Sequence, residues 1–165
     1  MAHFTPIDMN TWPRGEHFHY FAHMAPTGYS LTAEVDVTRL RAALKRRELR
    51  FYPAYLWLVT HSLNAREAFR LAEKDGVLGV YNTLPPENAY TVSCMPWVSF
   101  RHFAVHSYDS KAYYFPSVEA GRFEEWDGRT ILPLSITCHH AATDGWHVKG
   151  FLEQLHWKRT ASGSG

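Results

Sequence analysis

Residues 131–148 read ILPLSITCHHAATDGWHV, and their pattern predicts a strand, a tight turn and a helix in succession. Because side chains alternate along a strand, His140 continues an apolar face, whereas His139 faces the other side. Asp144 precedes an apolar helical stripe, which is the position of an N-cap. The segment is therefore expected to carry His140 on a strand to the turn that starts a helix.

The residue types in this turn allow structural and chemical interpretations. A histidine that ends an apolar strand face is most often a hydrogen-bonded core residue, and an aspartate before a helix is most often a plain cap. A zinc site formed by His139, His140, Asp144 and His147 would have suitable ligands. Neighbouring strand residues point in opposite directions, so we expect no metal site. Catalysis by His140 stays open on spacing alone.

The remaining elements follow from periodicity, caps and turn residues. Residues 54–59 are apolar nearly all round, which predicts a core helix buried on several sides. The sequence also predicts a helix from Trp12 to about Tyr20, a strand from Tyr29 to Asp36, a helix capped by Thr38, hairpins within residues 69–81 and 122–139, and strands at 89–95 and 103–108. Helices come early and strands later, so we expect an α/β fold of two layers, with a mixed β-sheet and helices on one face.

Composition narrows the class of protein. The chain has 165 residues, with 17 basic and 16 acidic side chains, and this balance lacks the positive surplus typical of proteins that bind nucleic acid or anionic membranes. The longest strongly apolar run is too short to span a membrane, and the start has no signal-peptide pattern. Cys94 and Cys138 lack the spacing of a zinc site or a disulfide framework. We expect a cytoplasmic protein with free thiols and a small-molecule ligand.

Four motifs in the same order resemble the chloramphenicol acetyltransferase family. The first is histidine, three residues, then Asp-Gly, at residues 140–145. The others are WPRGEHF at 12–18, FYP at 51–53 with FRLAEKDG at 69–76, and SCMPWVSF at 93–100. The resemblance covers nearly all of the chain on either side of one gap. It implies the fold of the CoA-dependent acyltransferases.

The resemblance implies transfer of acetyl from acetyl-CoA to a hydroxyl of chloramphenicol or a similar small acceptor, and thus a role in antibiotic resistance. In this family the residue matching His140 is the general base that takes the proton of the acceptor hydroxyl. The residue matching Ser93 donates a hydrogen bond to the oxyanion of the tetrahedral intermediate. A preorganised donor of this kind contributes about 3 kcal/mol in a dry site.

Other matched positions support the site. The resemblance implies that Asp144 pairs with Arg14 to hold the loop of the base, as structural support. Tyr20 and Tyr29 match aromatic positions of the acceptor pocket, and Trp97 matches a position expected to contact coenzyme A. The family also implies a homotrimer, with each active site between two subunits and no metal.

The chain departs from the family in two places. Between Val80 and Tyr90 the family carries a long segment that helps form the acceptor pocket, and here residues 81–89, with a double proline, replace it. Glu119 stands where the family has a threonine that helps organise the transition state, and an ionised carboxylate there would repel the oxyanion. We expect one domain over residues 1–161, shortened in its middle, and a flexible Gly/Ser tail or cloning scar at 162–165.

These departures keep two alternatives open. One is a non-catalytic relative that binds chloramphenicol or a similar small hydrophobe, and such binding would survive loss of His140. The other is a shortened chain that folds without specific binding, which would show neither turnover nor saturable binding.

Overall fold

The computed structural model describes residues 3–82, 90–106 and 113–155, so the expected tail at 162–165 lies outside the described residues. The elements in chain order are β1 (Phe4–Pro6), α1 (Gly15–His19), β2 (Gly28–Asp36), α2 (Thr38–Arg46), α3 (Phe51–Asn64), β3 (Leu71–Lys74), β4 (Val77–Tyr81), β5 (Thr91–Cys94), β6 (Ser117–Ala120), β7 (Glu124–Trp126), β8 (Arg129–His139) and α4 (Gly145–Leu155). A π-helix at Tyr20–Met24 follows α1, and a 3₁₀ turn at Glu67–Arg70 precedes β3.

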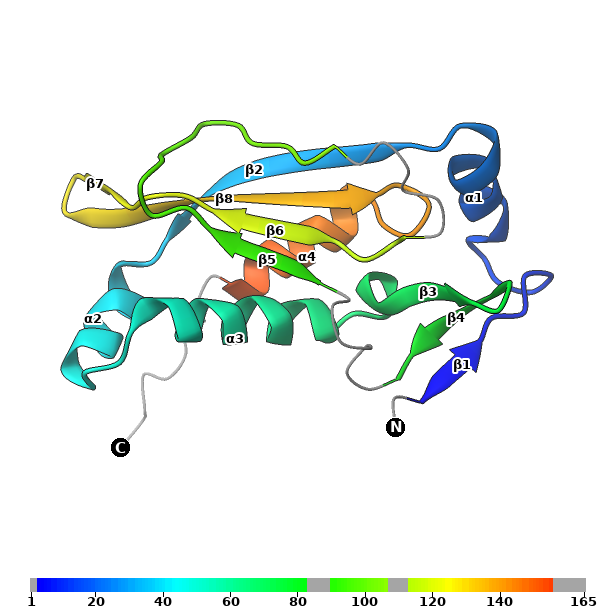
Figure 1. Ribbon diagram of the computed structural model, residues 1–165, viewed down its shortest axis with the longest axis horizontal. Coiled ribbons are helices and arrows are strands. Elements are labelled where there is room, and N and C mark those ends of the chain that lie inside the picture. Colours follow the sequence, from blue (N-terminus) through cyan, green and yellow to red (C-terminus); the bar gives the residue numbers. More distant parts are fainter. Residues whose placement is uncertain (1–2, 83–89, 107–112, 156–165) are drawn as a thin grey trace.

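A five-stranded mixed sheet forms the centre of the fold (Figure 1). Its strand order is β2-β8-β6-β5, and β7 forms a hairpin with β8. β8 runs antiparallel to β2 and β6, while β5 is parallel to β6. The predicted strand at 29–36 and both hairpins are confirmed. β6 is a strand that the sequence pattern did not predict, because it has only four residues and three of them are buried.

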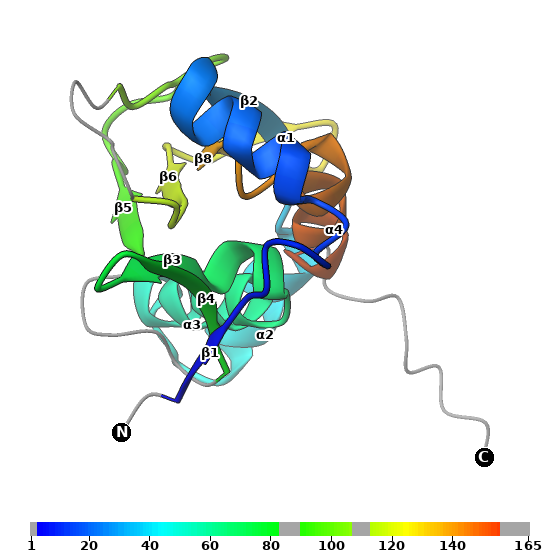
Figure 2. The same ribbon diagram turned by 90° about the vertical axis from the view of Figure 1, so that its right-hand side faces the viewer.

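A second sheet of three strands, in the order β1-β4-β3, lies below α1 and beside the end of the large sheet (Figures 1 and 2). Gly79 allows β1 to approach β4, because a Cβ at this position would lie 2.5 Å from the carbonyl oxygen of Thr5. β1 was not predicted, since three residues are too few to show alternation. The described residues therefore form two sheets in place of the one expected.

The apolar core lies between the large sheet and the helices α3 and α4, as the prediction of helices on one face requires. Leu134 and Ile136 point from β8 towards Leu63 of α3 and Phe151 of α4, and all four side chains are buried. Burying side chains of this size stabilises a fold by about 1.5–3 kcal/mol each, before the loss of conformational entropy.

The opposite face of the large sheet is polar and is crossed by the segment after β5, drawn in green above the sheet in Figure 1. The backbone N–H of Phe103 donates to Thr32 Oγ1 at 3.2 Å, and Ser135 Oγ donates to the Phe103 carbonyl at 2.5 Å. Residues 103–106 form no strand, so that prediction is wrong there, and 107–108 lie outside the described residues. This segment bonds to side-chain hydroxyls instead of to a strand backbone.

The helix starts show how local chemistry sets the boundaries. α1 begins at Gly15, later than the predicted Trp12. Asp36 Oδ1 accepts the N–H of Thr38 at 3.0 Å, and α2 has no side-chain cap bond from its own N-cap residue, so Thr38 is not the cap. The predicted capping role of Asp144 is confirmed, because its Oδ1 accepts the N–H of Trp146 at 3.0 Å.

The prediction that α3 is buried on several sides is wrong. Tyr55, Val59 and Leu63 are buried against the sheet, whereas Trp57 is 60% exposed and stacks on His61 on the outer side of the helix. An apolar run cannot distinguish a helix enclosed by the core from one with an exposed aromatic face.

The two faces of α3 give a stability prediction. Leu63→Ala should destabilise the fold by about 2–5 kcal/mol, because it leaves a cavity beneath the sheet. Trp57→Ala removes a larger side chain from the same helix and should cost less than about 1 kcal/mol, because that side chain is mostly in solvent. Urea unfolding measures both, and similar costs for the two variants would contradict this arrangement of α3.

Candidate active site

His140 directly follows β8, in the turn before α4. Its backbone N–H donates to the carbonyl of Thr27 at 2.8 Å, which continues the β2–β8 pairing into the turn. Its ring Nδ1 lies 3.0 Å from the carbonyl oxygen of Thr143. A carbonyl can only accept, so Nδ1 carries the proton and the neutral ring has its lone pair on Nε2. The turn therefore orients His140 as a proton acceptor.

Aromatic rings surround the imidazole of His140. The ring centroid of Phe21 lies 4.1 Å away, and those of His17 and Tyr29 lie 5.2 and 5.4 Å away. His17 also donates from Nε2 to the carbonyl oxygen of His140 at 2.8 Å. The half-buried ring is thus held between the helix that starts at Gly15 and the first residues of β2.

The structure brings only one of the two predicted acceptor-site tyrosines to His140. Tyr29 lies beside the ring, whereas Tyr20 is 47% exposed and lines a separate surface hollow with Met9 and Met24. Sequence reasoning missed His17 and Phe21. Their spacing of four residues, which places two helical side chains on the same face, was the signal that could have found them.

Asp144 joins the turn of His140 to the start of the chain. Its Oδ2 accepts a hydrogen bond from Arg14 Nη1 at 2.8 Å, and its Oδ1 lies 2.8 Å from Nδ1 of His147. Burial opposes ionisation, but the hydrogen bond from Arg14 and the nearby His147 outweigh it and lower the pKa of Asp144 to about 2. The expected Arg14–Asp144 pair is present in the structure.

His139 lies on the face of β8 opposite to that of Ile136 and Cys138, but it is buried instead of solvated. Its ring packs edge-on against Tyr114 at 5.0 Å, and its Nδ1 accepts the N–H of Ala141 at 3.1 Å. Burial, followed by the proximity of His140, lowers the pKa of His139. In the described part of the chain, no group of three potential metal ligands comes together.

Ser93 lies on the polar face of the large sheet. In the register of β5, β6 and β8, it stands in a row with Glu119 and Ser135. Tyr55 of α3 donates its hydroxyl to the carbonyl of Ser93 at 3.0 Å and so fixes β5 from below. Glu119 is only 3% exposed, and burial raises the pKa of its carboxyl to about 6, against a weaker opposite effect of Ser117.

The structure does not bring Ser93 and His140 together within one chain. Ser93 stands in the row of Ser135, and His140 follows Ser135 by five residues. With about 3.3 Å per residue and about 4.8 Å between strands, their Cα atoms lie roughly 19 Å apart. One chain therefore carries two separate groups of candidate residues, one in the turn after β8 and one on the polar face of the sheet.

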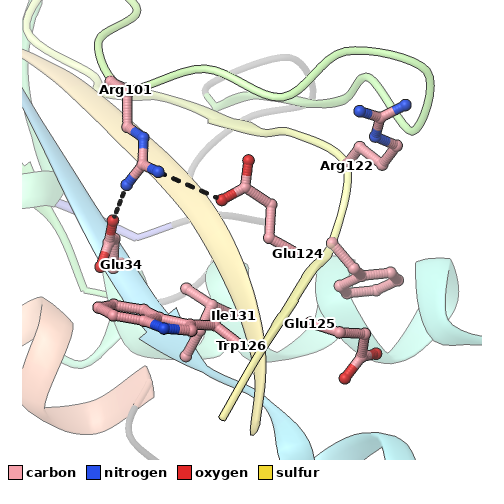
Figure 3. Close-up of a pocket in the computed structure, with 8 residues that line it drawn as sticks. Glu34, Arg101, Arg122, Glu124, Glu125, Trp126 and Ile131 are labelled. Carbon is pink, nitrogen blue, oxygen red and sulfur yellow. Dashed lines mark hydrogen bonds and ion pairs between the residues drawn. The ribbon is translucent and has the colours of Figure 1, made fainter. Parts of the chain in front are cut away.

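A hollow of about 640 Å³ opens at the end of the sheet away from His140 (Figure 3). Arg101 spans it, because its Nη1 lies 2.6 Å from Oε1 of Glu34 and its Nη2 lies 3.7 Å from Oε2 of Glu124. Arg122 lies on the rim, and its side chain forms no ion pair with any residue that the structure describes. The backbone of Arg122 donates to Val98, the neighbour of Trp97, whose side chain is 72% exposed.

The Arg14–Asp144 pair predicts an acid-dependent stability. A carboxyl with a lowered folded pKa stabilises the fold above its unfolded value of 3.8, and this contribution is lost as the pH falls through about 2. Asp144→Asn should therefore destabilise the protein at pH 7 by about 1–2 kcal/mol, discounted for partial exposure, and by less at pH 3. Urea unfolding at both pH values measures this.

Glu34→Gln is the matched control for Asp144→Asn, because it breaks an exposed pair with Arg101 and should cost less than about 0.5 kcal/mol. Equal costs for the two variants at pH 7 would show that the Arg14–Asp144 pair has no special role.

Comparisons with known proteins give matches over most of the sequence. A sequence model of the family described as chloramphenicol acetyltransferase matches residues 2–86 and 82–156. A chloramphenicol acetyltransferase of Streptomyces acrimycini is 31% identical and covers 91% of each chain. A chloramphenicol acetyltransferase 2 of Haemophilus influenzae is 29% identical over 92% of this chain and 95% of the relative.

Solved structures share the fold. A chloramphenicol acetyltransferase superposes with a TM-score of 0.84 at 24% identity, over 94% of this chain and 97% of that one. The cubic core of a pyruvate dehydrogenase multienzyme complex superposes with a TM-score of 0.53 at 13% identity, over 86% and 85% of the chains. No described helix is long and apolar enough to cross a membrane. With the family match spanning nearly the whole sequence, the chain belongs to the chloramphenicol acetyltransferase family.

Proposed function

We propose that this protein is an acetyl-CoA-dependent O-acetyltransferase, which moves an acetyl group to a hydroxyl of chloramphenicol or a similar acceptor in the cytoplasm and so gives antibiotic resistance. The observation that carries the proposal is the ring of His140, whose proton sits on Nδ1 against Thr143 and whose Nε2 is left to accept a proton. The relatives named chloramphenicol acetyltransferase support the same reaction.

The mechanism uses His140 as base and then as acid. Nε2 takes the proton of the acceptor hydroxyl while its oxygen bonds to the acetyl carbonyl carbon. The carbonyl oxygen becomes an oxyanion, which accepts a hydrogen bond from Ser93 Oγ. When the intermediate collapses, the carbon–sulfur bond breaks and the departing thiolate takes the proton back from His140. Arg14 and Asp144 hold the turn and stay outside the reaction.

The distance between the two groups of residues supports an active site shared by two copies. Ser93 and His140 of one chain are too far apart to contact one acetyl group. Because they are this far apart on the sheet, His140 of one copy can meet Ser93 of a neighbour in a closed ring. We therefore propose a homotrimer, whose head-to-tail contacts would repeat one interface three times.

Coenzyme A fits the end of the sheet away from His140. The hollow there offers Phe123 and Trp126 as aromatic surfaces and Arg122 as a cation whose side chain has no described ion-pair partner. Trp97 is exposed and directly precedes Val98, whose carbonyl accepts the backbone N–H of Arg122. Arginine is well suited to phosphate groups, so we propose that Arg122 binds a phosphate of acetyl-CoA.

The chain is shortened where the acceptor pocket would be completed. The two matched stretches of the family meet at residues 82–86. The alignment with the Streptomyces acrimycini relative spans 201 positions, more than the 165 residues of this chain. We propose that residues 81–89 bridge a missing segment within a single domain over residues 1–161, and that the acceptor side is more open than in the relatives. Residues 83–89 lie outside the described residues. Tyr29 and Phe21 then remain as the walls of the acceptor side.

The test is acceptor-dependent release of free CoA thiol from acetyl-CoA. Adding chloramphenicol to the wild-type chain should start release, and His140→Ala and Ser93→Ala should each lower it by a factor of about 100 or more. His61→Ala is the matched control, because that histidine is exposed on α3 against Trp57 and should leave the rate unchanged. Absence of release, with saturable chloramphenicol binding by calorimetry, would instead establish a non-catalytic binding protein.

The shared site is tested by mixing the two inactive variants. Unfolding and refolding His140→Ala together with Ser93→Ala should restore up to about a quarter of the wild-type activity, because hybrid trimers contain sites with both native residues. The control mixes His140→Ala with the double variant, which cannot form a native site. Failure of the first mixture to exceed the control would contradict the shared site.

The coenzyme site gives a separate prediction. Arg122→Ala should raise the KM for acetyl-CoA by a factor of about 10 or more and leave kcat nearly unchanged, since a charged hydrogen bond contributes about 1.5–3 kcal/mol. Arg39→Ala, an exposed arginine on α2, is the control and should change neither constant. An unchanged KM in Arg122→Ala would place the phosphates elsewhere.

A further inference from the structure

Glu119 is a buried carboxyl that the proposed mechanism does not use. It lies in the middle of the large sheet on the polar face, and only 3% of its surface is exposed. The segment after β5 lies over this face, and its Phe103 carbonyl accepts a hydrogen bond from the hydroxyl of Ser135. Ser135 therefore donates to the covering segment.

One oxygen of this carboxyl has no hydrogen-bond partner in the part of the chain that the structure describes. Oε2 of Glu119 is fully buried and forms no hydrogen bond there, and Glu119 makes no ion pair with a described lysine, arginine or histidine. Among the described residues, the groups beside it on the polar face are uncharged hydroxyls, namely Ser93 on β5, Ser117 on β6 and Ser135 on β8, whereas Tyr55 of α3 lies beneath the sheet on the core side. A buried polar atom without a partner costs free energy unless a ligand or water supplies one.

The position of Glu119 adds the chemical argument. Its Cα is the register partner of Ser93 on the neighbouring parallel strand, so the two side chains leave the same face side by side. Burial raises the pKa of Glu119 to about 6, so the neutral acid persists to a higher pH than for an ordinary glutamate and is the main form below about pH 6. A carboxylic acid donates a hydrogen bond through its O–H, whereas a carboxylate only accepts.

We propose that Glu119, as the neutral carboxylic acid, is a second catalytic donor, which binds the acetyl carbonyl oxygen beside Ser93. The inference rests on the proposed acetyl transfer. Glu119 keeps its proton throughout: the acceptor's proton moves to His140 and then to the leaving thiol, while the O–H of Glu119 stabilises the oxyanion. Ionised Glu119 would repel that oxyanion, so the neutral form is the active one.

The decisive experiment compares the pH dependence of kcat/KM in the wild type and in Glu119→Gln. Glutamine keeps a donor of similar shape and cannot ionise. The wild type should lose activity as Glu119 ionises, whereas Glu119→Gln should keep its activity, so the ratio of the two rates should rise by up to about tenfold per pH unit above about pH 6. Glu119→Leu keeps the bulk but has no donor, and its kcat should fall by about 100-fold or more.

A readout independent of turnover is the unfolding temperature as a function of pH. A carboxyl with a raised folded pKa stabilises the fold below its unfolded value of 4.5, and this contribution is lost as the pH rises through about 6. The unfolding temperature of the wild type should therefore fall relative to that of Glu119→Gln across this window. A constant difference would show that Glu119 is ionised throughout, which would overturn the proposal.

The outcomes separate this inference from the proposed function. Turnover with the same pH profile in the wild type and Glu119→Gln would overturn the role of Glu119 and leave the acetyltransferase intact. A wild-type chain that releases no CoA thiol at any pH would overturn the proposed function, and the role of Glu119 with it. If Glu119→Leu fails to fold, the comparison with Glu119→Gln still decides.

Discussion

The antiparallel pairing of β2 with β8 is the constraint on which the rest of the structure depends. It runs without interruption from Gly28 opposite His139 to Asp36 opposite Ile131. Because side chains alternate, this register sends every second residue of both strands towards α3 and α4 and the others to the polar face. A slip by one residue would exchange the two faces, so the core and the position of His140 rest on the same set of backbone hydrogen bonds.

The same pairing also fixes the position of His140. The ladder ends at His139, and the bond from the N–H of His140 to Thr27 extends it by one more residue into the turn. Asp144 then closes the turn by capping α4 and binding Arg14. The imidazole is therefore positioned by backbone groups and a charged pair, which leaves its Nε2 for chemistry.

Sequence reasoning could predict what depends on local pattern. The alternation in residues 29–36 predicted β2, and the position of Asp144 predicted the cap of α4. It could not predict contacts set by tertiary packing: Trp57 and Tyr55 look alike in an apolar run, yet one is exposed and the other is buried. The four motifs identified His140 and Ser93, but neither pattern nor motif gave their separation in one chain, which follows only from the strand order.

Two carboxyls show how the fold assigns opposite states to the same chemical group. Asp144 is partly exposed and bound by Arg14, and its pKa is lowered to about 2, so it remains an anion that supports the turn. Glu119 is buried among hydroxyls, with no cation paired to it in residues 3–82, 90–106 and 113–155, and its pKa is raised to about 6. Environments that separate the pKa values of similar groups distinguish acid and anion roles in active sites. A sheet with one polar, covered face can thus keep a carboxyl beside Ser93 neutral up to about pH 6, and the anion that forms at higher pH would oppose the reaction.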